Sequence, residues 1–392
     1  MRLRDIPLSS SAIRELTILS RQLGAVNLSQ GFADEDTWPE IKEFARRAIG
    51  EPTHQYTDPR GEPGFREQIA RLCSRQFGWE VDREQNVVVT CGATEAMIVC
   101  MEALLPERAE VILFTPFYEN YFLQTLISNM RARCVDLREP SFAIEREALE
   151  AAWSPATAAL VLCNPCNPVG KVFSREELAS ILDFAREHDL LVFVDETYHH
   201  FIWDGATHVS LASLPGARDR VITIVSMGKT YSVTGWRVGY LIAPAPLVAQ
   251  LSAVHDFHTI TAPHPLQAAL SHALRELDAT FYDKVRREYL FRRELLTAAL
   301  RGCGFTFADP QGSYFLWCGY QSISSAADIA FSQWLLHQGG IAGLPGSVFY
   351  PKGAPDTKRI RFTFSKSRAT LEAAKERLAL LRAAAEQSRT PG

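Results

Sequence analysis

The sequence has no stretch of about 20 apolar residues, the length that a helix needs to cross a membrane. Its first residues, MRLRDIPLSSSAIREL, also lack the apolar core of a signal peptide, so we expect a cytoplasmic protein with no membrane partner. Neither sign of charge is in large excess, because the formal net charge is only -4 over 392 residues. This balance gives no sign of a nucleic-acid partner.

The cysteines form no pattern of metal ligands or disulfides. All eight are scattered through predicted strands and helices, so in a reducing compartment we expect free thiols and no metal. Cys163 and Cys166 have the CxxC spacing, but a zinc site needs a second pair of ligands, which the sequence does not supply. A redox pair needs its first cysteine exposed at a helix start, whereas Cys163 closes an apolar strand. We interpret the spacing as incidental.

The composition, with 47% hydrophobic and 22% charged residues, is typical of a soluble globular protein. A chain of this length predicts two lobes. In the first lobe helical and strand patterns alternate, which predicts an α/β fold with a mostly parallel sheet covered by helices. The patterns indicate helices near 40–48, 64–77, 94–105, 119–128 and 174–188, and strands at 86–90, 111–115, 132–137, 158–163, 190–195 and 221–226.

After about residue 280 the pattern changes to that of a smaller α+β lobe. The elements predicted there are a long charged helix at 281–300, short strands at 305–307, 313–318 and 359–364, and a closing helix at 368–386. We therefore expect three parts, which are an N-terminal arm of residues 1–39 that joins the small lobe, a large lobe of residues 40–285 and a small lobe of residues 286–392.

Lys229 lies in the stretch around which the other motifs are organised, TIVSMGKTYSVTGWRVGY. It follows the end of the predicted strand 221–226, where an open α/β sheet presents reactive side chains. An amine held there can condense with an aldehyde if its pKa is lowered. Ser226 and Arg237 flank it at spacings suited to binding a phosphate, as a hydroxyl donor and a guanidinium fork. A surface lysine on a turn is the alternative.

Three further stretches place useful groups after predicted strands. The run Gly92-Ala93-Thr94 opens a helix, and helix N-termini expose backbone N–H groups to anions. Tyr118 follows the next strand and offers a face on which a planar ring can stack. Asn167 lies in a loop with two Asn-Pro pairs, which aims its amide side chain. Each feature alone also fits a helix cap, a core aromatic or an ordinary turn.

Charged residues complete the set. Asp195 ends the strand 190–195, where a carboxylate is costly unless it meets a cation such as a protonated pyridine nitrogen, its recurrent partner in pyridoxal phosphate sites. A helix cap is the alternative. Arg359 and Arg361 alternate with apolar residues, so both lie on one face of a strand. Either could bind a carboxylate with two hydrogen bonds, and the pattern alone does not choose between them.

Together these groups specify pyridoxal phosphate, and the chain resembles the class I, fold-type I aminotransferases that use it. Within that family it is similar to the kynurenine aminotransferases, also called glutamine transaminase K, and the methionine aminotransferases. The resemblance covers nearly the whole chain and is carried by AVNLSQGF, HQYTDPRG, GATEA, TPFYENY, NPCNPVGKVFSREEL, VDETYHHF, SMGKTYSVTGWRVG, PQGSYFLW and IRFTFSKSRATL. It implies a homodimer with shared active sites and a ping-pong exchange between an amino acid and a 2-oxo acid.

The resemblance also implies a role for each motif residue. Lys229 is the expected Schiff-base lysine and proton shuttle, and Asp195 the partner of the pyridine nitrogen. Asn167 and Tyr198 hold the phenolic oxygen of the ring, and Tyr118 stacks on it. The other implied residues are Ala93, Thr94, Ser226 and Arg237 at the phosphate, Tyr56 at the phosphate of the neighbouring subunit, and Gly31 and Arg361, with Asn167, at the substrate.

The sequence departs from the family pattern around an intact cofactor site. Val169 replaces a threonine, Glu119 an aspartate and Ala33 a proline, and Ile13 stands where kynurenine enzymes often have a tryptophan. Residues 258–261, His-Thr-Ile-Thr, replace an aromatic residue and a histidine of the partner subunit. We therefore expect bulky aromatic substrates to be weaker than in true kynurenine enzymes.

The segment 252–267 bears on the charge of the substrate. Dicarboxylate-selective relatives use an arginine of the partner subunit from this region, but here its only possible cations are His255, His258 and His264. Because a buried carboxylate opposite neutral groups is costly, we expect neutral L-amino acids such as methionine and glutamine to be preferred over aspartate.

Two other functions remain open at this point. An enzyme with the same cofactor could catalyse elimination, γ-replacement, oxidation or cyclisation in a specialised biosynthetic pathway. A ligand-sensing regulator could use the same fold without catalysis, but such proteins carry a DNA-binding extension, and only a short segment precedes the shared motifs.

Overall fold

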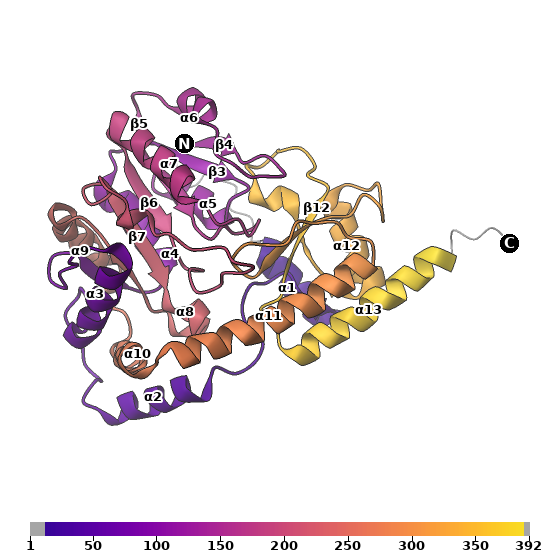
Figure 1. The fold of residues 1–392 in the computed structure, drawn as a ribbon, viewed down its shortest axis with the longest axis horizontal. Coiled ribbons are helices and arrows are strands. Elements are labelled where there is room, and N and C mark those ends of the chain that lie inside the picture. The colour runs from indigo at the N-terminus through magenta and orange to yellow at the C-terminus, as the bar shows by residue number, and fades with distance from the viewer. Residues whose placement is uncertain (1–11, 388–392) are drawn as a thin grey trace.

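The computed structural model of the chain describes residues 12–387 and is built around a seven-stranded sheet (Figure 1). The strands, in spatial order, are β2 (Val87–Thr90), β8 (Gly239–Ile242), β7 (Val221–Ser226), β6 (Leu191–Asp195), β5 (Thr157–Cys163), β3 (Glu110–Thr115) and β4 (Arg131–Asp136). Neighbouring strands are parallel except at β8, which is antiparallel to both β2 and β7. The predicted α/β fold with a mostly parallel sheet is confirmed.

Burial follows the composition of the strands. The central strands β6 and β7 are rich in valine and isoleucine and are almost wholly buried, because helices cover a parallel sheet on both faces. The edge strand β4 instead exposes both Arg131 and Arg133. Charged side chains on an edge strand discourage pairing with other chains.

Helices pack around this sheet and against one another. They are α2 (Pro39–Gly50), α3 (Pro63–Phe77), α4 (Ala93–Leu104), α5 (Glu119–Ile127), α6 (Arg146–Ala152), α7 (Arg175–Glu187), α8 (Met227–Thr230), α9 (Ala245–Thr259) and α10 (His264–Glu276). Helix α4 contacts β7 and β8 and also packs along α9. Ser174 and Glu177 form a capping box at the start of α7, where the sequence predicts a helix start.

A second, smaller group of elements follows. Its three-stranded antiparallel sheet has the order β11 (Leu344–Pro345), β12 (Arg359–Thr363) and β9 (Phe315–Gly319). Its helices are α11 (Ala279–Gly302), α12 (Asp328–Gly339) and α13 (Arg368–Gln387), and α11 and α13 lie side by side (Figure 1). The strand predicted at 305–307 is wrong, since Thr306 forms only an isolated bridge with Gly319 before Pro310 interrupts the extended chain.

The N-terminal segment joins this smaller group. Helix α1 (Ala12–Gln22) leads into β1 (Val26–Asn27), which pairs in parallel with β10 (Ile341–Ala342).

Among the helices of the described part of the chain, none combines the length and the apolar character needed to span a bilayer.

The topology brings four predicted site residues to one edge of the large sheet. Tyr118 follows β3, Asn167 follows β5, Tyr198 follows β6 and Lys229 follows β7, each within a few residues of the strand end. Because these four strands are parallel, their carboxyl ends share one edge, which is where open α/β sheets bind ligands.

Candidate active site

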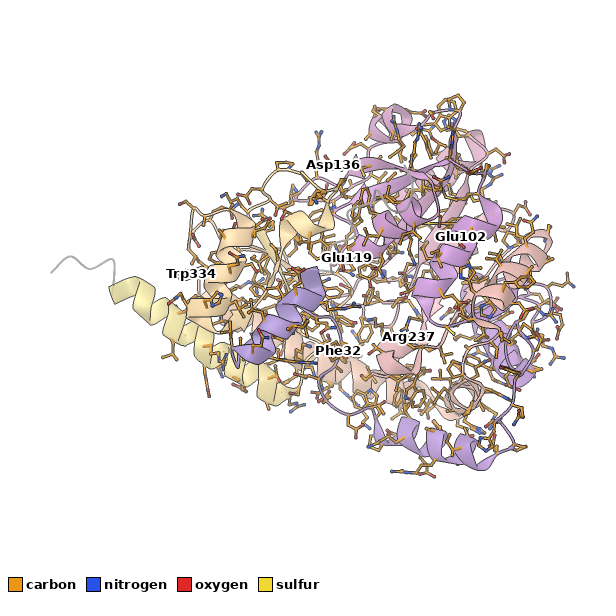
Figure 2. The ribbon with its side chains drawn as sticks, turned by 180° about the vertical axis from the view of Figure 1, so that it is seen from behind. Phe32, Glu102, Glu119, Asp136, Arg237 and Trp334 are labelled. Carbon is orange, nitrogen blue, oxygen red and sulfur yellow. The ribbon has the colours of Figure 1, made fainter. Side chains whose placement is uncertain are left out.

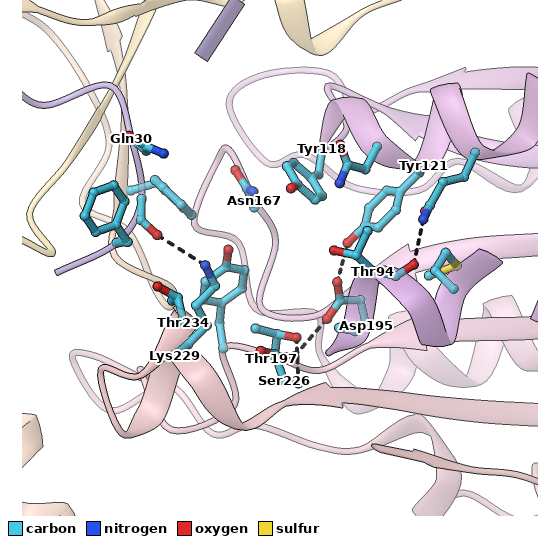
Figure 3. A pocket seen from close by; sticks show the side chains of 18 of the residues that line it. Gln30, Thr94, Tyr118, Tyr121, Asn167, Asp195, Thr197, Ser226, Lys229 and Thr234 are labelled. Atoms are coloured by element: carbon cyan, nitrogen blue, oxygen red, sulfur yellow. Dashed lines mark hydrogen bonds between the residues drawn. The ribbon is translucent and has the colours of Figure 1, made fainter. Parts of the chain in front are cut away.

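A cavity of about 250 Å³ lies at this edge (Figure 3). The predicted site residues that line it are Gly31, Ala93, Thr94, Tyr118, Asn167, Asp195, Tyr198, Ser226, Lys229, Arg237 and Arg361. Tyr56 does not line the cavity of its own chain, and its side chain is 76% exposed. The topology therefore gathers every predicted site residue except the one expected to serve the neighbouring subunit.

Lys229 enters the cavity from the single helical turn α8, directly after β7. Its Nζ donates a hydrogen bond to the carbonyl oxygen of Gly31, at 3.3 Å. Burial lowers the pKa of Lys229 from 10.5 to about 8, Asp195 opposes this change, and the cations Arg237 and Arg361 add to it. An amine with this pKa is neutral for part of the time near physiological pH and can act as a nucleophile or a base.

Asp195 is 8% exposed and is held at both oxygens. Oδ1 accepts a bond from the Thr197 N–H at 3.0 Å, and Oδ2 accepts one from the Tyr121 hydroxyl at 2.7 Å (Figure 3). The Thr197 contact is the local cap considered from the sequence, but the carboxylate also lines the cavity. It can thus hold a cation there while its orientation is fixed.

Tyr121 is a site residue that the sequence analysis missed. It lies three residues after Tyr118 on α5, so both rings project from one face of the helix. Burial raises the pKa of the Tyr121 hydroxyl well above its usual value, and the nearby Asp195 carboxylate adds to this effect. The hydroxyl therefore stays protonated and donates to Asp195. The i, i+3 spacing in TPFYENY is the signal that could have revealed it.

The turn before α4 and the guanidinium of Arg237 form an anion-binding corner. Arg237 donates to the carbonyl oxygens of Cys91 and Thr234, both at 3.1 Å, and so lies across Gly92. Gly92 has a φ of +83°, and a Cβ there would lie 2.5 Å from Arg237 Nη2, so only glycine allows this approach. The first amides of α4 have no partner within the helix and are available to an anion.

The structure distinguishes the two arginines of β12. Arg359 forms two hydrogen bonds with the Glu139 carboxylate, at 2.8 and 2.6 Å, and is therefore already paired. Arg361 is 2% exposed and donates from Nη1 to Asn167 Oδ1 at 2.9 Å and from Nη2 to the Ser29 carbonyl at 2.6 Å. Its Nε is buried and has no partner among the described residues. Of these two arginines only Arg361 lines the cavity, and the hydrogen bonds of its guanidinium to Asn167 and Ser29 use only some of its N–H groups.

Aromatic rings enclose the remaining walls. Tyr118 is half-buried at the start of α5, and Tyr198 is 6% exposed with its ring at a right angle to that of Tyr314. Burial raises the pKa of both tyrosines, that of Tyr118 to about 12, so their hydroxyls are protonated donors at neutral pH. Phe315 and Phe349 lie against the Arg361 guanidinium, with ring centres 4.2 and 4.9 Å from it.

The CxxC pair takes no part in this arrangement. Cys163 and Cys166 are both buried, and burial raises the pKa of each thiol, that of Cys166 to about 12. The Cys163 thiol donates to the carbonyl oxygen of Pro165 at 3.3 Å. Thiols held in the protonated form are poor metal ligands and nucleophiles, which agrees with the interpretation of this spacing as incidental.

Residues 24–378 match the profile of the family described as aminotransferase class I and II. The chain belongs to this family. It is similar to the methionine aminotransferase of Escherichia coli strain K12, with 33% identity over 95% of this chain and 96% of that protein. It is also similar to the mouse kynurenine–oxoglutarate transaminase 1, with 32% identity over 93% of both chains.

Solved structures give the same result. The crystal structure of an E. coli methionine aminotransferase superposes with a TM-score of 0.92 over 97% of this chain and 99% of that one, at 33% identity. N-succinyldiaminopimelate aminotransferase from Mycobacterium tuberculosis superposes with a TM-score of 0.93, at 35% identity and with the same coverage. The resemblance and the fold-type I architecture are confirmed. The chain is a pyridoxal-phosphate-dependent aminotransferase, which exchanges amino groups between amino acids and 2-oxo acids. These relatives do not favour the alternative of a diverted chemistry.

The residues present fit the cofactor of this family. The corner at Gly92 offers amides and a guanidinium to a phosphate, and a side chain at Gly92 would clash there. The buried Asp195 carboxylate matches the positive end of a protonated pyridine ring. Lys229 supplies an amine of lowered pKa in the same cavity.

Proposed function

We propose that this aminotransferase binds pyridoxal phosphate in the described cavity and exchanges amino groups between neutral L-amino acids and 2-oxo acids by a ping-pong mechanism. One observation carries the proposal. A single cavity is lined by an amine of lowered pKa (Lys229), a fixed carboxylate (Asp195) and a guanidinium with a free donor (Arg361).

The cofactor would be held at its two ends. Ala93 and Thr94 at the N-terminus of α4, with Ser226 and Arg237, would bind the phosphate group by hydrogen bonds and charge. Asp195 would keep the pyridine nitrogen protonated, supported by the hydroxyl of Tyr121. Asn167 and Tyr198 would donate to the phenolic oxygen, and Tyr118 would stack on the ring.

When bound, pyridoxal phosphate supplies an aldehyde for the substrate amine and a ring that takes up the electrons released at the α-carbon. Lys229 performs the proton transfers, because its Nζ lies in the cavity and its lowered pKa lets it accept a proton near neutral pH. Asp195 holds the proton at the pyridine nitrogen. Arg361 orients the substrate by binding its α-carboxylate with its guanidinium, at the part of the cavity that Gly31 also lines.

Neutral substrates are favoured by the charges around the cavity. Among the described lining residues the cations are Lys229, Arg237 and Arg361, and the roles above use all three. The histidines of 252–267 have other partners, since His255 bonds Glu95, His258 bonds Glu102 and the His264 ring contacts the Gln55 carbonyl. No cation of this segment is left for a second substrate carboxylate.

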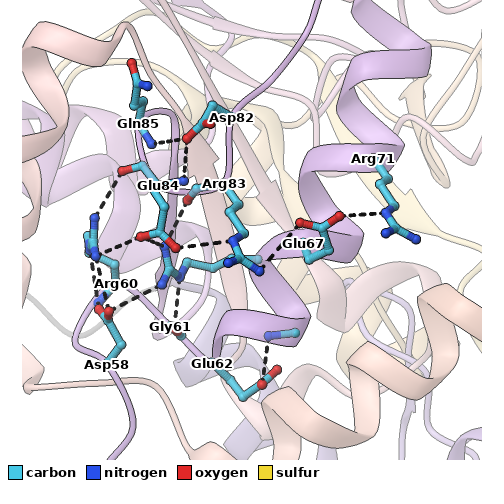
Figure 4. A network of polar contacts seen from close by, with 12 residues as sticks. Asp58, Arg60, Gly61, Glu62, Glu67, Arg71, Asp82, Arg83, Glu84 and Gln85 are labelled. Atoms are coloured by element: carbon cyan, nitrogen blue, oxygen red, sulfur yellow. Dashed lines mark hydrogen bonds and ion pairs between the residues drawn. The ribbon is translucent and has the colours of Figure 1, made fainter.

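A homodimer would complete the site. Tyr56 lies on a loop whose base is fixed by ion pairs of Arg60 with Asp58 and Glu84 (Figure 4), while its own ring is exposed. Phe257 and Ile260 are also exposed, by 93% and 45%. We propose that these residues face a second copy of the chain, with Tyr56 reaching the phosphate site of that copy.

We also propose that residues 1–39 form the N-terminal arm, residues 40–285 the large lobe and residues 286–392 the small lobe.

Titration of the purified enzyme with methionine, glutamine, aspartate and kynurenine tests the substrate assignment. Three quantities are compared for the four amino acids, namely the absorbance change of the cofactor, the amount of matching oxo acid released and kcat/KM. Each should be largest for methionine or glutamine. A preference for aspartate would contradict the proposal of neutral substrates. Borohydride reduction followed by peptide mass spectrometry should find the cofactor attached to Lys229.

Mixing two variants, one inactive and one impaired, tests the shared site. Lys229→Ala lacks the amine in its own cavity, and Tyr56→Phe lacks the hydroxyl that is expected in the other cavity of the dimer. A hybrid dimer therefore has one cavity with both defects and one with neither, so mixing should restore activity above that of either parent. Absence of restored activity, together with a monomeric mass in light scattering, would reject the shared site.

A further inference from the structure

Gln30 is a polar residue of the cavity that none of the roles above uses. Its side chain is half-buried and is among those that line the cavity. In Figure 3 its amide nitrogen points away from the chain that carries it and over the cavity. Within residues 12–387 this nitrogen donates no hydrogen bond to the protein. It is therefore a donor that a bound molecule can use.

A chain of hydrogen bonds determines which end of this amide faces the cavity. Asn27 Oδ1 accepts bonds from the backbone N–H groups of Ser29 and Gln30, at 3.0 and 3.3 Å, so the other end of the Asn27 amide is its NH2 group. That group donates to the Thr17 hydroxyl at 3.2 Å, and the hydroxyl donates to Gln30 Oε1 at 2.9 Å. The carbonyl end of Gln30 is thus held by α1, and its NH2 end is left for the cavity.

The backbone on either side of Gln30 contacts the two groups that would hold the substrate. The Ser29 carbonyl accepts a bond from Arg361 Nη2 at 2.6 Å. The Gly31 carbonyl accepts one from Lys229 Nζ at 3.3 Å. In the proposed function Arg361 binds the α-carboxylate, and the α-amine takes the place of the Lys229 amine at the cofactor. The α-carbon, which carries both groups, would therefore lie opposite Gln30.

The side chain of Gln30 extends from this backbone towards α1, because its Oε1 is bound to Thr17. Figure 2 shows Phe32, two residues further along the segment, between α1 and Arg237. Phe32 and Arg237 both line the cavity, which thus continues along this segment from the proposed phosphate site towards α1. With the carboxylate and the amine already placed, the side chain of the substrate is the group that remains for the end near α1.

We propose that Gln30 determines substrate specificity by donating a hydrogen bond from Nε2 to an oxygen in the side chain of the amino acid. Within the neutral class, the preferred substrates are then those with such an acceptor, for example the amide of glutamine or the sulfoxide of methionine sulfoxide. Methionine and norleucine have similar length but offer only a weak acceptor or none. The inference rests on the proposed function, from which it takes the positions of the carboxylate and the amine.

An amide donor also agrees with the preference for neutral side chains. It carries no charge, so it can satisfy a buried oxygen acceptor without offsetting the desolvation of a carboxylate. One neutral hydrogen bond of this kind contributes about a three- to tenfold difference between a substrate that has the acceptor and one that lacks it.

Steady-state kinetics of the Gln30→Met variant tests the proposal. Methionine keeps the length of the side chain but has no N–H group. The ratio of kcat/KM for L-methionine sulfoxide to kcat/KM for L-methionine should fall about three- to tenfold in the variant. The ratio for L-methionine to L-norleucine should not change, because neither substrate uses the donor.

Binding gives the same comparison without turnover. Lys229→Ala enzyme loaded with pyridoxal phosphate is titrated with each amino acid, and the change in cofactor absorbance gives the dissociation constant. Adding Gln30→Met should weaken methionine sulfoxide about three- to tenfold and leave methionine unchanged. Equal losses for both amino acids would overturn the proposal, since they are expected if Nε2 binds the α-carboxylate instead.

Two substitutions of Thr17 test the chain of hydrogen bonds that orients the amide. Thr17→Val removes the hydroxyl that holds Gln30 Oε1, so it should lower the ratio of methionine sulfoxide to methionine. Thr17→Ser keeps a hydroxyl and should preserve that ratio. If Thr17→Val instead lowers kcat/KM equally for all three amino acids, α1 has only a structural role and the proposal is overturned. Thr17→Val also gives the decision if Gln30→Met does not fold.

The outcomes distinguish this inference from the proposed function. Wild-type enzyme that releases no oxo acid from any neutral amino acid would overturn both. An active wild type whose ratio of methionine sulfoxide to methionine is the same in Gln30→Met would overturn the inference alone.

Discussion

Lys229 should lower the stability of the cofactor-free protein, and replacing it with methionine should raise that stability. Burial lowers the pKa of Lys229 from 10.5 to about 8, so the charged amine is disfavoured in the folded state. A tenfold change in proton affinity corresponds to about 1.4 kcal/mol, and this change of pKa therefore costs about 3 kcal/mol where the amine is charged in both states. Lys229→Met should increase the free energy of unfolding at pH 7 by about 1–3 kcal/mol while abolishing turnover.

The sign of the pH dependence makes this prediction specific. Below about pH 8 the folded and unfolded chains both carry the proton, and the full cost applies. Between about pH 8 and 10.5 the folded protein has lost the proton that the unfolded chain keeps, so wild-type stability rises with pH. The advantage of Lys229→Met should therefore shrink by about 2 kcal/mol between pH 7 and about pH 9.5.

Urea unfolding of the cofactor-free proteins at the two pH values measures this difference. Lys375→Met is the control, because Lys375 is 54% exposed and forms a surface ion pair with the nearby Glu372. Its substitution should change stability little and equally at both pH values. A Lys229→Met variant that is less stable than wild type, or whose advantage does not change with pH, would refute the reasoning.

Three further predictions concern other residues of the site. Asp195→Asn should lower kcat by several orders of magnitude with little change in cofactor affinity, because the charge acts mainly in the transition state; equal losses in both would contradict this role. Tyr121→Phe removes a bond of 2.7 Å to that carboxylate and should lower kcat about tenfold without loss of folding, as measured by steady-state kinetics and circular dichroism. Arg361→Lys should raise KM for the amino acid about 100-fold, whereas Arg359→Lys, which alters contacts with Glu139 and Gln321 away from the cavity, should leave KM unchanged.

The large sheet could be predicted from the sequence because its strands are short apolar runs with clear ends. The strand predicted at 221–226 is β7 residue for residue. The parallel strands β6, β5 and β3 differ from the prediction by one residue at the start, and β4 is shifted by one residue as a whole. The strand β8 and the helices α1, α6, α8, α9, α10 and α12 were not predicted. Two of these helices, α9 and α12, have apolar residues spread around the helix instead of along one stripe. A pattern without a single apolar face gives little helical signal, since contacts on several sides stabilise the helix.

The site could be predicted as a set of residues but not as a set of contacts. Strand-end motifs identified Lys229 and Asp195, because parallel strands bring their carboxyl ends together. They could not identify Tyr121 or choose between Arg359 and Arg361. Those answers depend on which partner each side chain meets across the fold, such as Glu139, which lies 220 residues from Arg359. The substitution at Ile13 lies outside the described side chains, so its effect on aromatic substrates stays a prediction.

The charges of the cavity also explain how one lysine can serve two successive needs. To capture an aldehyde, Lys229 must lose its proton, and burial together with the charges of Arg237 and Arg361 favours that loss in the free enzyme. To act later as a base, the neutral amine must take a proton from the substrate and keep it, which a higher pKa favours. A phosphate beside Arg237 and a carboxylate beside Arg361 would offset those two charges and leave Asp195 as the nearby anion that raises the pKa of the amine. Each anion that binds would thus increase the proton affinity of Lys229, and the second would do so when the substrate that supplies the proton is in place.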